Sequence, residues 1–130
     1  MEMPEKHCMV PLKKVKAICR YYHLQALWEK IENDPPVRPF KSDGCSLWLD
    51  VNLGHDLYPA CFLHDLKYWA GYPGEEVERL IADAELMIDA VRILGSVPLA
   101  ETIFRGVRIG GHEMYKRSFS WGFGRREGSE

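Results

Sequence analysis

Four side chains that can transfer protons or bind metals follow one another at helical spacing: Cys61, His64, Asp65 and Tyr68. On an α-helix, positions i, i+3, i+4 and i+7 share one face, which in an ordinary core helix carries Leu and Val. Imidazole is the usual general base in proteins, and a carboxylate is a ligand for hard cations. The pattern therefore predicts a chemical site on this helix, and the structural alternatives are a solvated polar face or a core histidine whose hydrogen bonds are satisfied.

A further carboxylate, Asp83, lies within the apolar stripe of the next predicted helix. The stripe is formed by Leu80, Ala84, Met87, Val91 and Leu94, and the opposite face carries Glu78, Glu85, Asp89 and Arg92. Burying an ionised carboxylate is unfavourable unless the group is hydrogen-bonded or paired. We therefore expect Asp83 to have a buried partner.

His64 is the partner that we expect for Asp83. The turn between the two helices is centred between Pro73 and Gly74, and the two side chains lie nine to ten residues on either side of that centre. A short connection makes the helices antiparallel, and each residue advances a helix by about 1.5 Å, so both side chains reach the same level. Either Asp83 fixes one nitrogen of His64 and leaves the other as a base, or the two form a structural pair.

The elements that position these residues are helices, and the sequence predicts an all-α class. Expected helices cover 11–32, 57–70, 75–94 and 96–110, with a long connection at 33–56 and a tail after 111 that forms a packed arm or a short hairpin. Pro11, Gly95 and Pro98 stand where helices begin or end. The connection contains Cys45, Trp48 and Leu53, so we expect an ordered binding loop rather than disorder.

Composition narrows the class of protein. The chain has 130 residues, of which 46% are hydrophobic, so we expect one domain over 1–130 with a substantial core. A formal net charge of −2 gives no basic field for nucleic acid, and no apolar run approaches the ~18 residues of a membrane span. Residues 1–14 are too polar for a signal peptide.

The cysteines leave their pairing open. Four cysteines at positions 8, 19, 45 and 61 allow two disulfides in three connectivities, and Cys8 and Cys19 could pair with each other. A zinc site from Cys45, Cys61 and histidines is disfavoured because the spacing is irregular.

A known family combines these motifs. The stretches Ser42-Asp43-Gly44-Cys45-Ser46, Ala60-Cys61 and His64-Asp65-x-x-Tyr68, with Asp50, Gly54 and the later Asp83, resemble the phospholipase A2 superfamily. The closest likeness is to its small prokaryotic and fungal branch, over roughly residues 40 to 110. The stretch 104–110 resembles the closing helix of the family more weakly.

The resemblance implies roles for the polar residues. His64 corresponds to the base that activates a water, Asp83 to its orienting partner, and Tyr68 to a supporting hydrogen-bond donor. Asp83 would thus belong to an antiparallel two-helix catalytic core, joined by a calcium-binding loop and further packing helices.

The resemblance also implies a calcium site and a disulfide. Asp43 and Asp65 would supply carboxylates and Gly44 its carbonyl oxygen, so the expected cofactor is Ca²⁺. Cys45 and Cys61 would form the disulfide that ties the calcium loop to the catalytic helix.

The implied activity is calcium-dependent hydrolysis of the sn-2 ester of glycerophospholipids. The partner would be a phospholipid membrane surface, bound peripherally. Trp48, Leu49 and Leu53 either are exposed and rest on this surface or belong to the core. The alternative is a non-catalytic calcium-binding, lipid-binding or structural module on the same fold. The family is largely exported and disulfides do not persist in a reducing cytosol, so export is expected, although the chain shows no signal peptide and a cytoplasmic location stays open.

Overall fold

A computed structural model describes residues 1–42, 54–115, 117 and 119–126 of the chain. Within these residues the structure is mostly helical, with five α-helices and one two-stranded sheet, which confirms the all-α class. The helices are α1 (Leu12–Tyr21), α2 (Gln25–Asn33), α3 (Gly54–Ala70), α4 (Glu76–Leu94) and α5 (Val97–Gly110). The strands are β1 (Met9–Val10) and β2 (Phe40–Lys41), and two 3₁₀ turns, η1 (Glu113–Tyr115) and η2 (Phe123–Arg125), follow α5.

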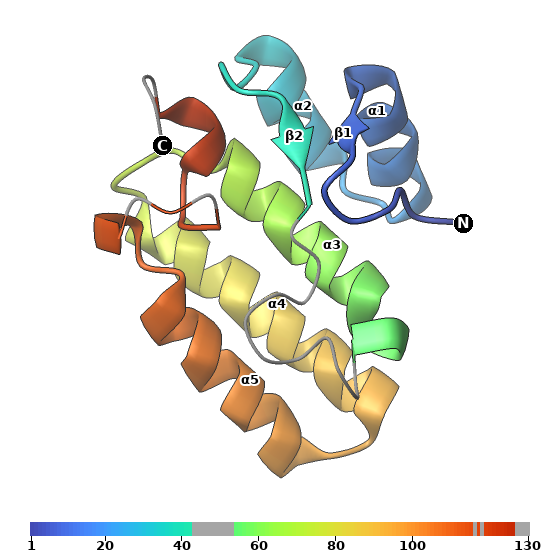
Figure 1. Cartoon of the computed structure of the whole chain (residues 1–130), viewed down its shortest axis with the longest axis vertical. Coiled ribbons are helices and arrows are strands. Elements are labelled where there is room, and N and C mark those ends of the chain that lie inside the picture. The colour runs from blue at the N-terminus through green and yellow to red at the C-terminus, as the bar shows by residue number, and fades with distance from the viewer. Residues whose placement is uncertain (43–53, 116, 118, 127–130) are drawn as a thin grey trace.

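The three long helices α3, α4 and α5 lie side by side and alternate in direction (Figure 1). Gly95 ends α4 in the left-handed conformation, with φ of 68°. Ser96 is the N-cap of α5, and its hydroxyl accepts a hydrogen bond from the Leu99 backbone amide at 3.2 Å. The predicted boundary between these helices is confirmed, whereas α3 begins three residues earlier than expected.

The single helix predicted over 11–32 is wrong, because the chain forms two helices there. His23 has φ of +60°, and its amide bonds to the Arg20 carbonyl while the Leu24 amide bonds to the Cys19 carbonyl. This pair of bonds is a Schellman ending, in which the left-handed residue is usually glycine. The apolar stripe shifts between α1 and α2 because the chain turns at this ending.

The buried apolar residues form two clusters. The larger joins α1, α2, the small sheet, the C-terminal half of α3 and the last described segment: it includes Val15, Ile18, Ile31, Phe40, Phe62, Leu66, Trp69, Trp121 and Phe123. The smaller joins the first part of α3 to α4 and α5: it includes Leu57, Cys61, Leu86, Ala90, Ala100 and Ile103. On α4, Asp83 lies between Ala82 of the larger cluster and Leu86 of the smaller one, whereas His64 on α3 lies among residues of the larger cluster.

The buried face of α4 is not the face that hydrophobicity predicts. Its buried residues are Arg79, Ala82, Asp83, Leu86 and Ala90. Leu80 is 44% exposed and Ala84 half-buried, while Met87, Val91 and Leu94 pack at the edge of the smaller cluster. The expected stripe is therefore displaced, because two charged side chains occupy the centre of the buried face.

The segment after α5 is a packed arm rather than a hairpin over its described residues. Trp121 and Phe123 are buried, and the Trp121 indole donates to the Tyr72 carbonyl at 2.8 Å. A Cβ added at Gly71 would lie 2.3 Å from the Trp121 ring, so glycine is needed at the end of α3 for this contact. The arm thereby fixes the turn between α3 and α4.

Candidate functional site

The two residues paired on sequence grounds are in contact. His64 Nε2 lies 2.7 Å from Asp83 Oδ1, and the Tyr68 hydroxyl donates to the same oxygen at 2.6 Å. Asp83 is fully buried, and His64 is 8% exposed. The equal distances of the two residues from the turn therefore bring them to one level, as expected.

The contact determines the tautomer of His64. An ionised carboxylate can only accept hydrogen bonds, so we assign the proton of a neutral imidazole to Nε2. Nδ1 then carries the lone pair. An imidazole held this way can take up a proton at Nδ1 while Asp83 stabilises the imidazolium.

Tyr68 is held tightly at this site. Its ring lies edge-on to Trp121 with centroids 5.1 Å apart, and a Cβ at Gly111 would come within 2.7 Å of it. Burial, followed by the charge of Asp83 and the hydrogen bond to it, raises the pKa of Tyr68 well above its ordinary value of 10.0. Tyr68 therefore remains a neutral hydrogen-bond donor.

Two arginines that the sequence analysis missed complete the surroundings of Asp83. Arg108 Nη1 donates to Asp83 Oδ2 at 2.7 Å, and Arg79 Nη1 lies 3.6 Å from the same oxygen. Arg79 stands four residues before Asp83 on α4, a spacing that allows an ion pair on one helix face and could have indicated it. Nothing in the sequence pattern predicts the contact from Arg108 on α5.

Arg79 joins three helices. It is 3% exposed, and its guanidinium donates to the Tyr68 hydroxyl on α3 and to the carbonyls of Val107 and Arg108 on α5. It also donates to Glu76 at 2.9 Å. A cation at the carbonyl end of a helix is favoured by the helix dipole. Arg79 therefore provides hydrogen-bond donors for the carbonyl oxygens in the last turn of α5 and holds that turn next to the His64–Asp83 pair.

The expected calcium ligands are described only in part. Asp43 and Gly44 lie outside the described residues, and Asp65 is 8% exposed, with its Oδ2 accepting from the Ser42 hydroxyl at 3.0 Å. Among the residues that the structure describes, no group of three His, Cys, Asp or Glu side chains could hold a metal. The Asp65 carboxylate has the oxygen chemistry that Ca²⁺ prefers. The calcium site stays a prediction because its other expected ligands, Asp43 and Gly44, lie outside the described residues.

Two of the four cysteines are free thiols in the structure. Cys8 and Cys19 are free thiols, so they do not pair with each other. Cys45 lies outside the described residues, as do Trp48, Leu49 and Leu53, and the predicted Cys45–Cys61 disulfide and lipid contacts stay predictions.

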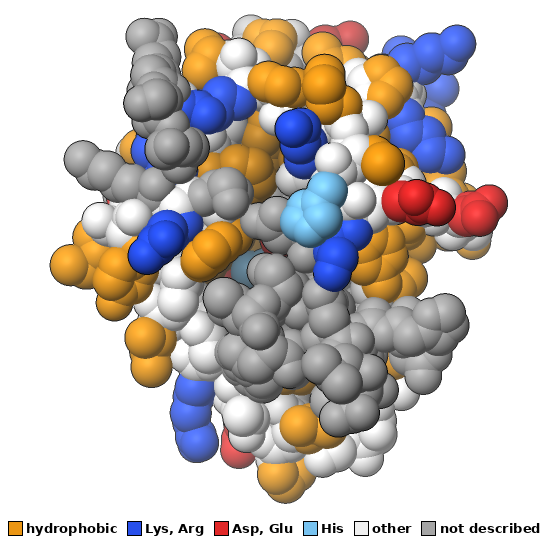
Figure 2. Space-filling view, viewed as in Figure 1, with side chains coloured by type: hydrophobic (Ala, Val, Ile, Leu, Met, Phe, Trp, Pro, Cys, Tyr) orange, Lys and Arg blue, Asp and Glu red, His pale blue; other side chains and the backbone are white. Residues whose placement is uncertain are grey.

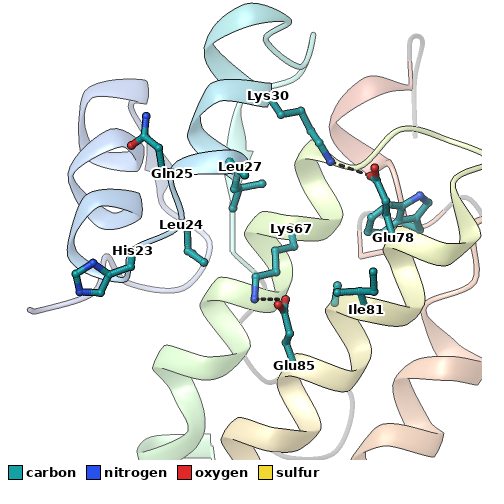
Figure 3. Close-up of a pocket in the computed structure, with 12 residues that line it drawn as sticks. His23, Leu24, Gln25, Leu27, Lys30, Lys67, Glu78, Ile81 and Glu85 are labelled. Carbon is teal, nitrogen blue, oxygen red and sulfur yellow. Dashed lines mark hydrogen bonds and ion pairs between the residues drawn. The ribbon is translucent and has the colours of Figure 1, made fainter.

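A cavity of about 370 Å³ opens between α2, α3 and α4, apart from the polar site (Figure 3). Leu24, Leu27 and Ile81 line it, and the ion pairs Lys30–Glu78 and Lys67–Glu85, each 2.9 Å long, cross it. The cavity lacks His64, Tyr68 and Asp83, and its four charged side chains are already paired. The lining residues of this cavity therefore give no reason to place the active site there.

The described surface has no concentrated charge on the face in Figure 2, where Lys and Arg side chains lie dispersed among hydrophobic and uncharged ones. Within the described residues, no helix is long and apolar enough to cross a membrane.

No family model, curated protein or solved structure matches the chain. Arguments about function therefore depend on the site itself.

Proposed function

We propose that the chain is a phospholipase A2-like ester hydrolase that cleaves the sn-2 ester of glycerophospholipids. The observation that supports this function best is the buried contact between His64 and Asp83, with Tyr68 on the same carboxylate oxygen. The contact fixes the tautomer of His64 and places an anion beside the ring, and a general base of this kind needs both.

In the proposed reaction, Nδ1 of His64 removes a proton from a water whose oxygen attacks the ester carbonyl. Asp83 stabilises the resulting imidazolium and keeps the ring in place through Nε2–H. The ester C–O bond then breaks, and the Nδ1 proton passes to the departing alkoxide. The products are a fatty acid and a lysophospholipid.

Asp43, Asp65 and the Gly44 carbonyl are the residues that would hold Ca²⁺ in this proposal. When bound, the ion would supply positive charge for the developing oxyanion and for the phosphate. Of these three ligands, Asp65 is the one within the described residues, buried on α3 next to His64.

The direct test is hydrolysis of a phospholipid that carries different acyl chains at sn-1 and sn-2. We expect release of the sn-2 fatty acid in the presence of calcium, and loss of this release when calcium is chelated. His64→Gln should reduce the rate by ~10²-fold or more, within the range for loss of a general base.

His23→Asn is the matched control, because His23 is exposed and asparagine tolerates its left-handed backbone. This variant should keep the wild-type rate. Full turnover by His64→Gln would assign the activity to other residues. An absence of turnover in every protein would instead favour the non-catalytic module.

A second comparison separates the metal from the base. Asp65→Asn replaces an anionic oxygen by a neutral amide and should weaken calcium, so added calcium should partly restore its rate. His64→Gln should bind calcium nearly normally in titration calorimetry while remaining slow at every calcium concentration. Equal calcium affinities for Asp65→Asn and the wild type would remove Asp65 from the proposed metal site.

A further inference from the structure

The two oxygens of the Asp83 carboxylate have different partners. Oδ1 accepts from His64 and Tyr68, and Oδ2 accepts from Arg108 at 2.7 Å. The terminal torsion of an aspartate is broad, so contacts at Oδ1 alone would leave the carboxylate plane poorly fixed. A charge-assisted bond at Oδ2 removes this freedom, since rotation would break it.

Arg108 is itself held in place. Its Nη2 donates to the Glu76 carboxylate, so one planar guanidinium bridges two acids on α4. Its backbone carbonyl accepts from Arg79 Nη2 at 3.1 Å, which ties the last turn of α5 to the first turns of α4. The side chain is 24% exposed. A lysine could supply the charge but not this two-acid bridge.

We propose that Arg108 is a positioning residue of the His64–Asp83 pair, which acts by holding the Asp83 carboxylate in the plane that faces His64. Its catalytic consequence rests on the proposed function. Its structural consequence, the fixed orientation of the His64 ring, does not require any turnover.

Loss of the bridge should slow the chemical step more than it weakens substrate binding. In Arg108→Gln, Asp83 Oδ2 loses its cationic donor and the ring of His64 gains freedom. Misplacement of a reacting group by about 1 Å can reduce a rate by ~10²-fold. We therefore expect kcat on a soluble short-chain phospholipid to fall by about 10- to 100-fold, with KM changed by less than about twofold.

The matched control is Arg105→Gln. Arg105 lies on the same helix about one turn earlier, and its side chain is exposed. Its replacement by glutamine removes the same charge from α5 without changing the site. Arg108→Lys distinguishes charge from geometry, because it keeps the charge and loses the bridge. It should remain at least about fivefold slower than the wild type.

The independent readout is the imidazole N–H resonance of His64 in protein labelled with ¹⁵N-histidine, assigned by its loss in His64→Gln. We expect a downfield, exchange-protected Nε2–H signal in the wild type and in Arg105→Gln. In Arg108→Gln this signal should move upfield or broaden, whether or not the protein hydrolyses any lipid. If Arg108→Gln does not fold, the same measurements on Arg108→Lys decide the question.

Three results would overturn the proposal: an unchanged His64 resonance in the folded Arg108 variant, a kcat equal to that of Arg105→Gln when the wild type is active, or complete restoration by lysine. A shifted resonance in a protein that has no esterase activity would retain the positioning role and reject the proposed function instead. The two failures can therefore be told apart.

Discussion

Replacement of Asp83 by asparagine should destabilise the fold strongly, although the two side chains have nearly the same shape. Donors approach both sides of the carboxylate, from His64 and Tyr68 at Oδ1 and from Arg108 at Oδ2. An amide has one oxygen, so in either orientation its NH₂ group faces a donor. The buried Arg79 also loses its nearby anion.

The magnitude follows from the burial of this network. Removal of one partner of a buried ion pair costs about 3–5 kcal/mol, since the remaining charge stays uncompensated. With a urea m-value of about 2 kcal/mol/M, the unfolding midpoint should fall by about 1.5–2.5 M. Urea titrations followed by tryptophan fluorescence measure this shift, and an unchanged m-value would show that the loss is one of stability.

Asp89→Asn is the control, because Asp89 lies on the same helix and pairs only with the exposed Arg92 among the contacts described here. Its cost should be within ~0.5 kcal/mol. A midpoint for Asp83→Asn that matches this control would refute the buried network. In the double variant with Arg108→Gln, the loss should be smaller than the sum of the two single losses by about 0.5–3 kcal/mol, because the two residues share one interaction.

Three further predictions follow from other contacts. Burial raises the pKa of the Cys19 thiol to about 11, so iodoacetamide at about pH 8 should modify the exposed Cys8 and spare Cys19 until urea is added, as read by mass spectrometry. Gly71→Ala should lower stability by about 1–3 kcal/mol in urea titrations, because its methyl group would overlap the buried Trp121 ring; a neutral effect would contradict the close packing of the arm. Hydrogen bonds from Arg79 and Arg108 lower the pKa of Glu76 below its ordinary 4.5. Glu76→Gln should therefore reduce the free energy of unfolding by up to ~1 kcal/mol above that pH, and its stability should converge with that of the wild type in more acidic buffer. A constant difference in stability across the pH range would exclude this linkage.

The sequence predicts the helical framework well where local signals and packing agree. The boundary between α4 and α5 could be predicted because both residues there have their usual roles. Gly95 ends α4 in the left-handed conformation, and Ser96 caps the start of α5. The helix ending at His23 escapes prediction because histidine stands where a glycine would have indicated the stop.

The contact between His64 and Asp83 could be predicted from the sequence, whereas the contact between Arg108 and Asp83 could not. His64 and Asp83 could be matched because a helix advances by a constant amount per residue, so distances from a turn become levels along the helices. Arg108 could not be matched, since its place depends on the packing of α5 against α4. The buried face of α4 was misjudged for a related reason: Arg79 is buried beside Asp83, and the spacing of apolar residues alone gives an arginine no place on a buried face.

The close packing of α3 against α4 also has a consequence for insertions and deletions in this chain. His64 and Asp83 are nineteen residues apart, and one residue added within either helix would rotate the side chains beyond it by about 100°. A residue added to the turn would instead disturb the glycine that accommodates Trp121. Changes in length between these two positions should therefore be rejected during evolution. Sequences that share this site should vary in length elsewhere while keeping the nineteen-residue interval.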